Sequence, residues 1–264
     1  MPWSAVHNVL LSCLFQSSPA VSVCRLPYVI LAKTEQRMFG LASLLGGGAN
    51  RGLNTRVQQV TAFWLTTFAT VGAFLLGSLP FAVWLGKLLA SADVRSVGDG
   101  NPGTANAFKA GGLRVGVPTL VLEVGKAGIP VWASGAALGL KSWALLPVAA
   151  APLLGHAFSP FLKFRGGKAI AATFGSWLGL TGIVYPLVLG LAMGACFAVQ
   201  SVHAWAVIGG VLLFGVFLAA SGGSVAHLVL WSANLTLLVW THRRELSPSF
   251  RPRGWLPVQR SKDR

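Results

Sequence analysis

Acidic residues are scarce in this chain of 264 residues, which has six of them against 21 lysines and arginines. Charged residues make up only 10% of the sequence, whereas soluble domains carry about 25%, so an ordinary soluble protein is excluded. From Ala169 to His242, a stretch of 74 residues, there is no Asp, Glu, Lys or Arg. A run of that length predicts several membrane-spanning helices, because one helix needs only about 20 apolar residues.

Cysteine is also rare, and the positions of Cys13, Cys24 and Cys196 fit neither a metal site nor a redox motif. We therefore predict no cofactor and no bound metal. The net charge is +15, but the basic residues are scattered between apolar segments instead of forming one soluble module. That distribution argues against nucleic-acid binding and favours basic loops on the cytoplasmic side of a membrane.

Three parts of the chain differ in composition. Residues 1–56 contain a weakly apolar stretch and a Gly-rich linker, and we predict an N-terminal extension outside the functional core. Residues 57–246 hold the long apolar segments and form the predicted transmembrane domain. Residues 247–264 form a predicted basic cytoplasmic tail.

The apolar segments predict an all-α, polytopic membrane protein with seven transmembrane helices. Three spans come first, at Val57–Leu85, Val115–Leu140 and Trp143–Leu162. If the basic loops 87–114 and 163–168 and the tail all face the cytoplasm, the uncharged run must hold an even number of spans. Four spans of about 18 residues fit, with breaks predicted at Tyr185-Pro186, Ser201–His203 and Ser221–Gly223. Three spans in total, with the tail outside, is the alternative.

Two glycine-rich loops stand out in this apolar chain. Gly98–Gly103 offers backbone N–H groups in a tight turn, and Arg95 and Lys109 add positive charge nearby, which is an arrangement that suits a phosphate group. Phe164–Lys168 combines two glycines with a lysine in the same way. A glycine loop such as the first is, when taken alone, usually just a turn. The second, taken alone, is equally compatible with a basic cytoplasmic connection.

Ionisable residues inside the apolar segments are the next candidates, because such groups are costly in a membrane. Glu123 and Lys126 are three residues apart and share one face of a helix. We favour a structural ion pair over a direct part in catalysis. His156 begins the segment that ends at Lys168.

The motifs occur in a characteristic order, at Gly77–Phe81, Gly98–Asn106, Leu122–Gly128 and Gly155–Thr173. This arrangement closely resembles the bacterial acyl-phosphate:glycerol-3-phosphate acyltransferases, the PlsY family, over about residues 57–246. The resemblance implies a seven-helix bundle in the cell inner membrane with its active site facing the cytoplasm. It implies transfer of an acyl chain from acyl phosphate to the sn-1 hydroxyl of glycerol 3-phosphate, which gives lysophosphatidic acid for phospholipid synthesis. The implied partners are these two substrates and the surrounding membrane lipid.

By motif position, the resemblance implies roles for individual residues of this chain. Those implied in substrate binding are Arg95, Gly98, Asp99, Gly100, Asn101, Gly103, Thr104, Asn106, Lys109, Lys168 and Ser201. Those implied in supporting roles are Ser78, Asp93, Glu123, Lys126, His156, Gly166 and Gly167. No Ser–His–Asp arrangement is evident, so we predict no acyl-enzyme. His242 matches the histidine of the third motif and is the candidate catalytic residue.

Several positions depart from the family pattern. Asp99 stands in place of a serine, Lys109 in place of an arginine, and Glu245 in place of an asparagine. These departures keep a second hypothesis open, in which a protein of this fold binds or carries an anionic lipid or an organic phosphate without turnover. A transporter would be expected to show internal repeats, and the sequence shows none.

Overall fold

A computed structural model describes residues 49–246 and residue 253 of the chain. The chain divides into two compact units, Met1–Gln59 and Val60–Arg264, and every predicted site residue lies in the second. The predicted extension 1–56 lies almost wholly outside the described residues. The predicted tail 247–264 does so too, apart from Arg253, and both remain predictions.

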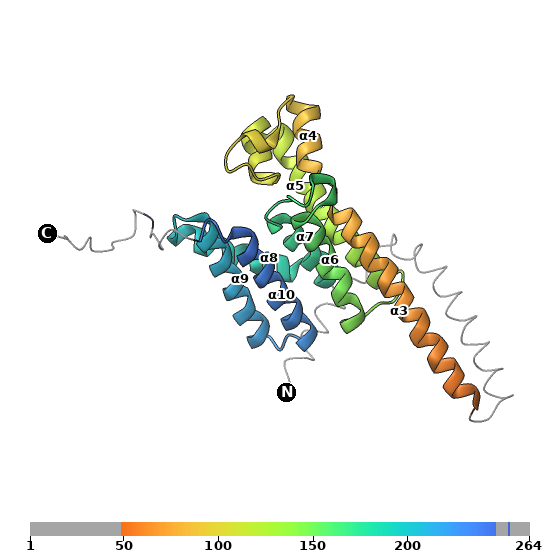
Figure 1. Ribbon diagram of the computed structural model, residues 1–264. Coiled ribbons are helices and arrows are strands. Elements are labelled where there is room, and N and C mark those ends of the chain that lie inside the picture. Colours follow the sequence, from red (N-terminus) through yellow and green to blue (C-terminus); the bar gives the residue numbers. More distant parts are fainter. Residues whose placement is uncertain (1–48, 247–252, 254–264) are drawn as a thin grey trace, which may run out of the picture. The chain divides into compact units, whose positions relative to one another are not determined.

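The described part of the chain is built from helices (Figure 1). The α-helices are α3 (Ala49–Gly77), α4 (Phe81–Ala90), α5 (Thr104–Ala136), α6 (Leu145–Ala157), α7 (Ile170–Thr181), α8 (Val184–Val199), α9 (His203–Ala220) and α10 (Val225–His242). Short 3-10 turns are η1 (Val94–Ser96), η2 (Ser142–Ala144) and η3 (Pro160–Leu162). The predicted all-α class is therefore confirmed.

Three of the described segments are long and apolar enough to cross a membrane, at Thr55–Ala90, Ser142–Leu162 and His203–Ala220. The first contains most of α3 together with α4, so α3–α4 and α5 to α10 make seven helical segments, as expected for the bundle. The uncharged run forms four helices, α7 to α10, and two of its three predicted breaks are correct. The break predicted at Tyr185-Pro186 is wrong by a few residues: Gly182, with φ +72°, ends α7, and Pro186 lies in the first turn of α8, where its missing N–H costs nothing.

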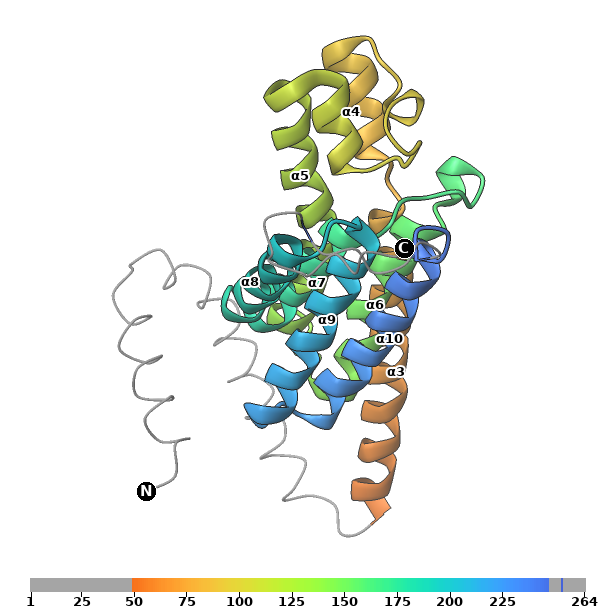
Figure 2. The ribbon, with the colours of Figure 1, turned by 90° about the vertical axis from the view of Figure 1, so that its left-hand side faces the viewer.

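The predicted loop 87–114 is partly helical, which corrects the sequence-based boundary. Thr104 begins α5, and a kink at Gly111 and Gly112 divides that helix into a short first segment and a long second one. Gly112 has φ +59°, a conformation that favours glycine, so the chain can change direction there without strain. Figures 1 and 2 both place α4 beside the first segment of α5, at the same end of the second unit.

Small residues bring the helices of the bundle close together. A Cβ atom on Gly128 of α5 would lie 2.8 Å from the carbonyl oxygen of Gly175 in α7, so the two backbones are nearly in contact. Glycine-mediated approach of this kind is how helices associate in a membrane, where no hydrophobic effect drives them together. At the centre of the bundle the buried Trp177 packs edge-on against Phe214, with ring centroids 5.1 Å apart.

Candidate functional site

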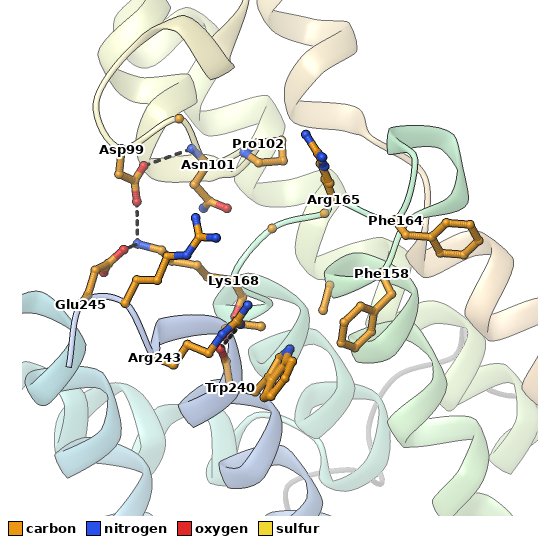
Figure 3. A pocket seen from close by; sticks show the side chains of 16 residues that line it. Asp99, Asn101, Pro102, Phe158, Phe164, Arg165, Lys168, Trp240, Arg243 and Glu245 are labelled. Atoms are coloured by element: carbon orange, nitrogen blue, oxygen red, sulfur yellow. Dashed lines mark hydrogen bonds and ion pairs between the residues drawn. The ribbon is translucent and has the colours of Figure 1, made fainter. Parts of the chain in front are cut away.

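An open cleft of about 560 Å³ lies where three separate segments of the chain meet. These segments are the loop 99–102 before α5, the loop 164–168 before α7, and the end of α10 with the turn that follows it; Ala157 and Phe158 at the end of α6 complete the lining (Figure 3). The lining residues are Asp99, Gly100, Asn101, Pro102, Ala157, Phe158, Phe164, Arg165, Gly166, Gly167, Lys168, Trp240, Thr241, Arg243, Arg244 and Glu245. The two glycine loops singled out in the sequence thus lie on one cleft, together with a third segment.

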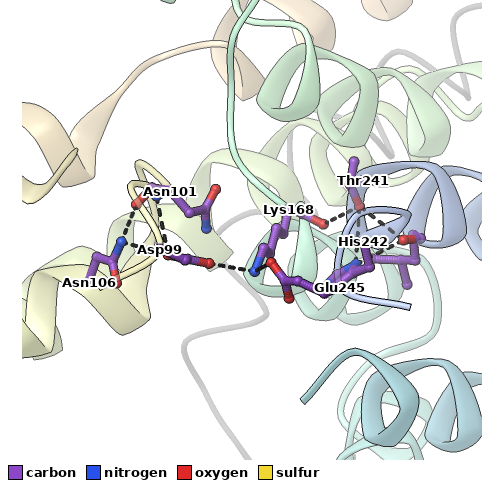
Figure 4. Close-up of polar contacts among 8 residues, drawn as sticks. Asp99, Asn101, Asn106, Lys168, Thr241, His242 and Glu245 are labelled. Atoms are coloured by element: carbon purple, nitrogen blue, oxygen red, sulfur yellow. Dashed lines mark hydrogen bonds and ion pairs between the residues drawn. The ribbon is translucent and has the colours of Figure 1, made fainter. Parts of the chain in front are cut away.

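Lys168 joins the three segments. Its Nζ atom lies 2.5 Å from Oδ2 of Asp99 and also forms an ion pair with Oε1 of Glu245 (Figure 4). The lysine side chain is only 16% exposed, whereas those of Asp99 and Glu245 are 41% and 36% exposed. Burial would lower the pKa of Lys168, but the bonds to the two carboxylates outweigh it and raise the pKa, so the lysine is charged.

Asp99 is also held by hydrogen bonds from neighbouring residues of its own segment. The buried Asn106 side chain donates to Oδ1 of Asp99 at 2.8 Å, and the backbone N–H of Asn101 donates to the same oxygen at 3.2 Å. Burial opposes ionisation of Asp99, but the bond from Lys168 and the other donors lower its pKa to about 2. The acid in this loop therefore has its cationic partner in Lys168.

The backbone of the first glycine loop is less available than the sequence predicted. The N–H of Gly100 donates to the carbonyl of Val97, that of Gly103 donates to Asn101, and that of Asn101 donates to Asp99. An N–H group already engaged in this way has no free hydrogen for a phosphate oxygen. The attraction for an anion therefore rests mainly on the side chains around the cleft, which is a correction to the idea of an open backbone cradle.

The second glycine loop is held against α6. Gly166 N–H donates to the carbonyl of Ala157 at 3.1 Å, and Gly167 N–H donates to that of His156 at 3.0 Å. A Cβ atom on either glycine would overlap His156 or Ala157. These two glycines are needed for close packing, and this packing positions Lys168 one residue later.

A buried charge cluster lies behind that loop. Oε2 of Glu123 is 2.7 Å from Nζ of Lys126 and 2.8 Å from Nδ1 of His156, and all three side chains are buried. Lys126 also donates to the carbonyl of Leu79, in the break between α3 and α4, at 2.7 Å. None of the three residues lines the cleft, and the cluster is connected to it only by the contacts of His156 with Gly166 and Gly167, which agrees with a structural ion pair. Ser78 belongs to the same region, since its carbonyl accepts a hydrogen bond from Ser159 at 2.6 Å.

The other predicted residues lie at different distances from the cleft. His242 is buried beside its lining, with Nδ1 2.8 Å from the carbonyl of Leu238. Arg95 pairs with Asp93 on the exposed side of the loop, Nη2 to Oδ2 at 2.6 Å, and does not line the cleft. Ser201 lies in the exposed turn between α8 and α9 and is also absent from the lining.

Two more predicted residues, Lys109 and Gly98, are neighbours just behind the first glycine loop. A Cβ atom built on Gly98 would be 2.7 Å from Nζ of Lys109. Thr104 begins α5 behind the same loop.

The predicted substrate-binding set left out four charged residues of the cleft, Arg165, Arg243, Arg244 and Glu245, because a motif does not show which charges meet in space. Arg243 is held by Trp240: its guanidinium lies 4.2 Å from the ring centroid of Trp240 and donates to the Trp240 carbonyl at 2.6 Å. No binding role was predicted for the pair Arg243 and Arg244. The position of this pair directly after His242, at the end of the last helix, was the signal in the sequence that could have indicated a role in the site.

Within the described residues, no group of three or more His, Cys, Asp or Glu side chains is placed to hold a metal ion.

Comparison with known proteins gives one consistent result. A family model described as glycerol-3-phosphate acyltransferase matches residues 67–251. The chain is 36% identical over 190 residues to the glycerol-3-phosphate acyltransferase of Maridesulfovibrio salexigens, covering 70% of this chain and 90% of that one. It is 35% identical over 195 residues to the enzyme of that name from Pseudomonas syringae pv. tomato, covering 71% and 94%.

A crystal structure of PlsY, an integral membrane glycerol 3-phosphate acyltransferase in its glycerol 3-phosphate form, aligns with a TM-score of 0.59. The identity is 29%, over 70% of this chain and 89% of that one. The lysophosphatidic acid form aligns with the same TM-score at 27% identity, over 68% and 88%. A helical membrane bundle with a basic, glycine-lined cleft and such relatives defines an integral membrane acyltransferase. The chain belongs to the glycerol-3-phosphate acyltransferase family, PlsY, whose reaction forms lysophosphatidic acid in phospholipid synthesis.

Proposed function

We propose that this chain uses acyl phosphate as its donor and transfers the acyl group to the sn-1 hydroxyl of glycerol 3-phosphate in the cleft around Lys168. The observation that carries this assignment is the meeting of Lys168 with Arg165, Arg243 and Arg244 on one glycine-lined surface. Both substrates carry a phosphate group, and a cluster of cations at the end of a membrane bundle suits two such anions.

The reaction needs little covalent help from the protein. The sn-1 oxygen attacks the carbonyl carbon of the mixed anhydride, the bond from that carbon to the phosphate oxygen breaks, and the hydroxyl proton is released. Phosphate is already a good leaving group, so the main tasks are to position two anions and to neutralise their charge. Lys168 supplies a point charge, and the arginines supply planar, directed donors.

His242 remains the candidate catalytic residue. Nδ1 faces the carbonyl of Leu238, which can only accept, so this nitrogen carries the hydrogen and Nε2 is left with its lone pair. His242 lies between Thr241 and Arg243, both of which line the cleft. Its buried position supports at least an orienting role at the end of α10.

We further propose that the cleft faces the cytoplasm and that the protein resides in the inner membrane. The lining is rich in basic residues, and the loop that begins at Lys163 and the turn at Arg243 both lie at this end. Short loops rich in Lys and Arg are retained on the cytoplasmic side. Reaction of an introduced cysteine at the exposed Arg244 with a membrane-impermeant thiol reagent tests this orientation: labelling is expected in inside-out vesicles and not in intact cells.

The activity is tested with the purified full chain, acyl phosphate and glycerol 3-phosphate. We expect release of phosphate and formation of lysophosphatidic acid, and we expect Lys168→Ala to reduce the rate to background. Lys141→Ala is the matched control, because Lys141 is an exposed lysine that does not line the cleft. Full activity of Lys168→Ala would refute the site assignment.

Two further results separate the alternatives. A rate that requires acyl-CoA or an acyl-carrier thioester in place of acyl phosphate would refute the proposed donor. Saturable binding of glycerol 3-phosphate without product formation from any donor would favour the binding protein that the altered motifs left open.

A further inference from the structure

In a site that binds phosphate, ion pairs between the central lysine and two carboxylates are unexpected, because all three groups carry charge that the lysine would neutralise. Asp99 and Glu245 both form such ion pairs here, from two different segments of the chain, one before α5 and the other after α10 (Figure 4). A carboxylate and a phosphate compete for the same ammonium group, because both bind through negatively charged oxygen atoms. An ammonium group has three N–H donors, and two of those of Lys168 already face carboxylates, so a phosphate that binds it through more than one donor has to displace one of the two acids.

The two acids are held very differently. Asp99 accepts hydrogen bonds from Asn106 and from the backbone of Asn101 in addition to Lys168, so it is fixed within its own loop. Glu245 lies in the turn that follows α10, where its N–H donates to the carbonyl of His242. Among the contacts of residues 49–246 and 253, the Glu245 carboxylate is paired with Lys168 alone. Swinging Glu245 away breaks one ion pair, whereas moving Asp99 breaks several bonds.

The positive charge around Glu245 favours a carboxylate at this position of the cleft. Arg243 and Arg244 precede it in the same turn, and Arg165 lies on the loop that carries Lys168. Without a substrate, these cations repel one another, and a nearby carboxylate reduces that repulsion. A phosphate monoester dianion brings up to two negative charges to the same place and can take over this role.

We propose that Glu245 is a displaceable counter-ion of Lys168, which competes with the phosphate group of glycerol 3-phosphate for the lysine and so sets the affinity for that substrate, whereas Asp99 stays on the lysine throughout. The proposal rests on the function proposed above and takes the phosphate group of glycerol 3-phosphate, the acceptor, as the substrate partner of Lys168. Because Glu245 is tethered beside the lysine, it competes at a high effective concentration. Each substrate molecule must overcome this competition before it binds.

The variant Glu245→Gln removes the competing charge and keeps the size of the side chain. We expect the KM for glycerol 3-phosphate to fall about 5-fold, which is the scale of a partly exposed ion pair, with kcat changed by less than about 2-fold. Glu245→Asp keeps the charge on a shorter side chain and is expected to give an intermediate KM. Damage to the turn alone would raise KM or lower kcat, so the direction of the KM change distinguishes the proposal from a structural role.

Asp263→Asn is the control for net charge. Asp263 belongs to the predicted basic tail and has no predicted part in the site, so its loss removes one negative charge from the chain, and we expect no fall in KM. An unchanged or higher KM in Glu245→Gln would overturn the proposal. An equal fall in KM in both variants would do the same, because the effect would then be one of general charge.

Calorimetric titration of the detergent-solubilised full chain with inorganic phosphate gives a readout that does not depend on turnover. Glu245→Gln is expected to bind phosphate about 5-fold more tightly than the original chain. If the chain binds phosphate in this way but makes no lysophosphatidic acid, the proposed function fails and the role of Glu245 stands. If turnover is normal but phosphate affinity is equal in both proteins, or phosphate binds to neither, the role of Glu245 fails.

Discussion

Gly167 and His156 contact each other through both the backbone and the side chain of the histidine. The N–H of Gly167 donates to the His156 carbonyl at 3.0 Å, and the His156 ring occupies the space that a side chain on Gly167 would need. The ring is held in turn by Glu123, 2.8 Å from its Nδ1 atom. The position of Lys168, one residue later, therefore depends on a charge cluster buried in the bundle.

The variant Gly167→Ala is expected to lower kcat/KM by about 100-fold while the protein still folds. The new methyl group would overlap Nε2 of His156, so the loop and Lys168 must shift, and a displacement of about 1 Å is enough for a loss of this size. The rate of lysophosphatidic acid formation measures the effect. Gly72→Ala is the control, since nothing lies within 4 Å of a Cβ atom there, and it should keep full activity.

The variant Glu123→Gln is expected to lower the free energy of unfolding by about 3–5 kcal/mol, because it leaves the buried Lys126 without its charged partner. Thermal unfolding in detergent measures this loss. The double variant Glu123→Leu with Lys126→Met removes both charges and should be clearly more stable than Glu123→Gln. If the double variant is the less stable of the two, the pair is not a structural ion pair of the kind described.

The stabilising contribution of Asp99 should persist down to mildly acidic pH. Its pKa is about 2 in the folded protein against an ordinary 3.8, so the stability it adds is fully present above about pH 4 and is lost as pH falls towards 2. The difference in Tm between the original chain and Asp99→Asn should therefore be constant from pH 8 to pH 5. A difference that already disappears between pH 7 and pH 5 would contradict the pairing with Lys168.

The variant Arg243→Ala is expected to raise the KM for glycerol 3-phosphate about 10-fold, the scale of one lost charge-assisted hydrogen bond. Arg243 is held by the Trp240 ring and carbonyl, so its guanidinium is ordered before the substrate arrives. Arg243→Lys keeps the charge but loses the planar contact with the ring, and we expect it to restore only part of the affinity.

Steady-state kinetics with glycerol 3-phosphate as the varied substrate measure both Arg243 variants. Arg114→Ala, an exposed arginine of α5 that does not line the cleft, is the control for charge. An Arg243→Ala enzyme with an unchanged KM would show that this arginine has no part in binding the phosphate group.

Much of the fold could be predicted from the sequence because it follows from composition. The lack of charge between Ala169 and His242 indicated four helices, and the observed helices α7 to α10 fill that run. The boundaries were less predictable. The start of α5 inside the predicted loop 87–114 depends on a kink at Gly111 and Gly112, and no hydrophobic pattern reports such a kink.

The site was predictable only in part, for a similar reason. Lys168 and the two glycine loops were found because glycine next to a cation is a local pattern. Arg95 also lies beside a glycine loop, yet its side chain does not line the cleft. It pairs instead with Asp93, the nearest carboxylate on its own turn. The free backbone N–H groups expected at Gly100 and Gly103 are used inside the loop itself.

The sequence by itself determined that this chain is a helical membrane protein and which family it resembles, because apolar length and motif order are properties of the chain as written. Only the tertiary structure decided that Asp99 and Glu245 share Lys168. These residues lie on three segments far apart in sequence, and their pairing depends on how α5, α7 and α10 pack together. An ion pair is set by distance in space, which the order of residues does not contain.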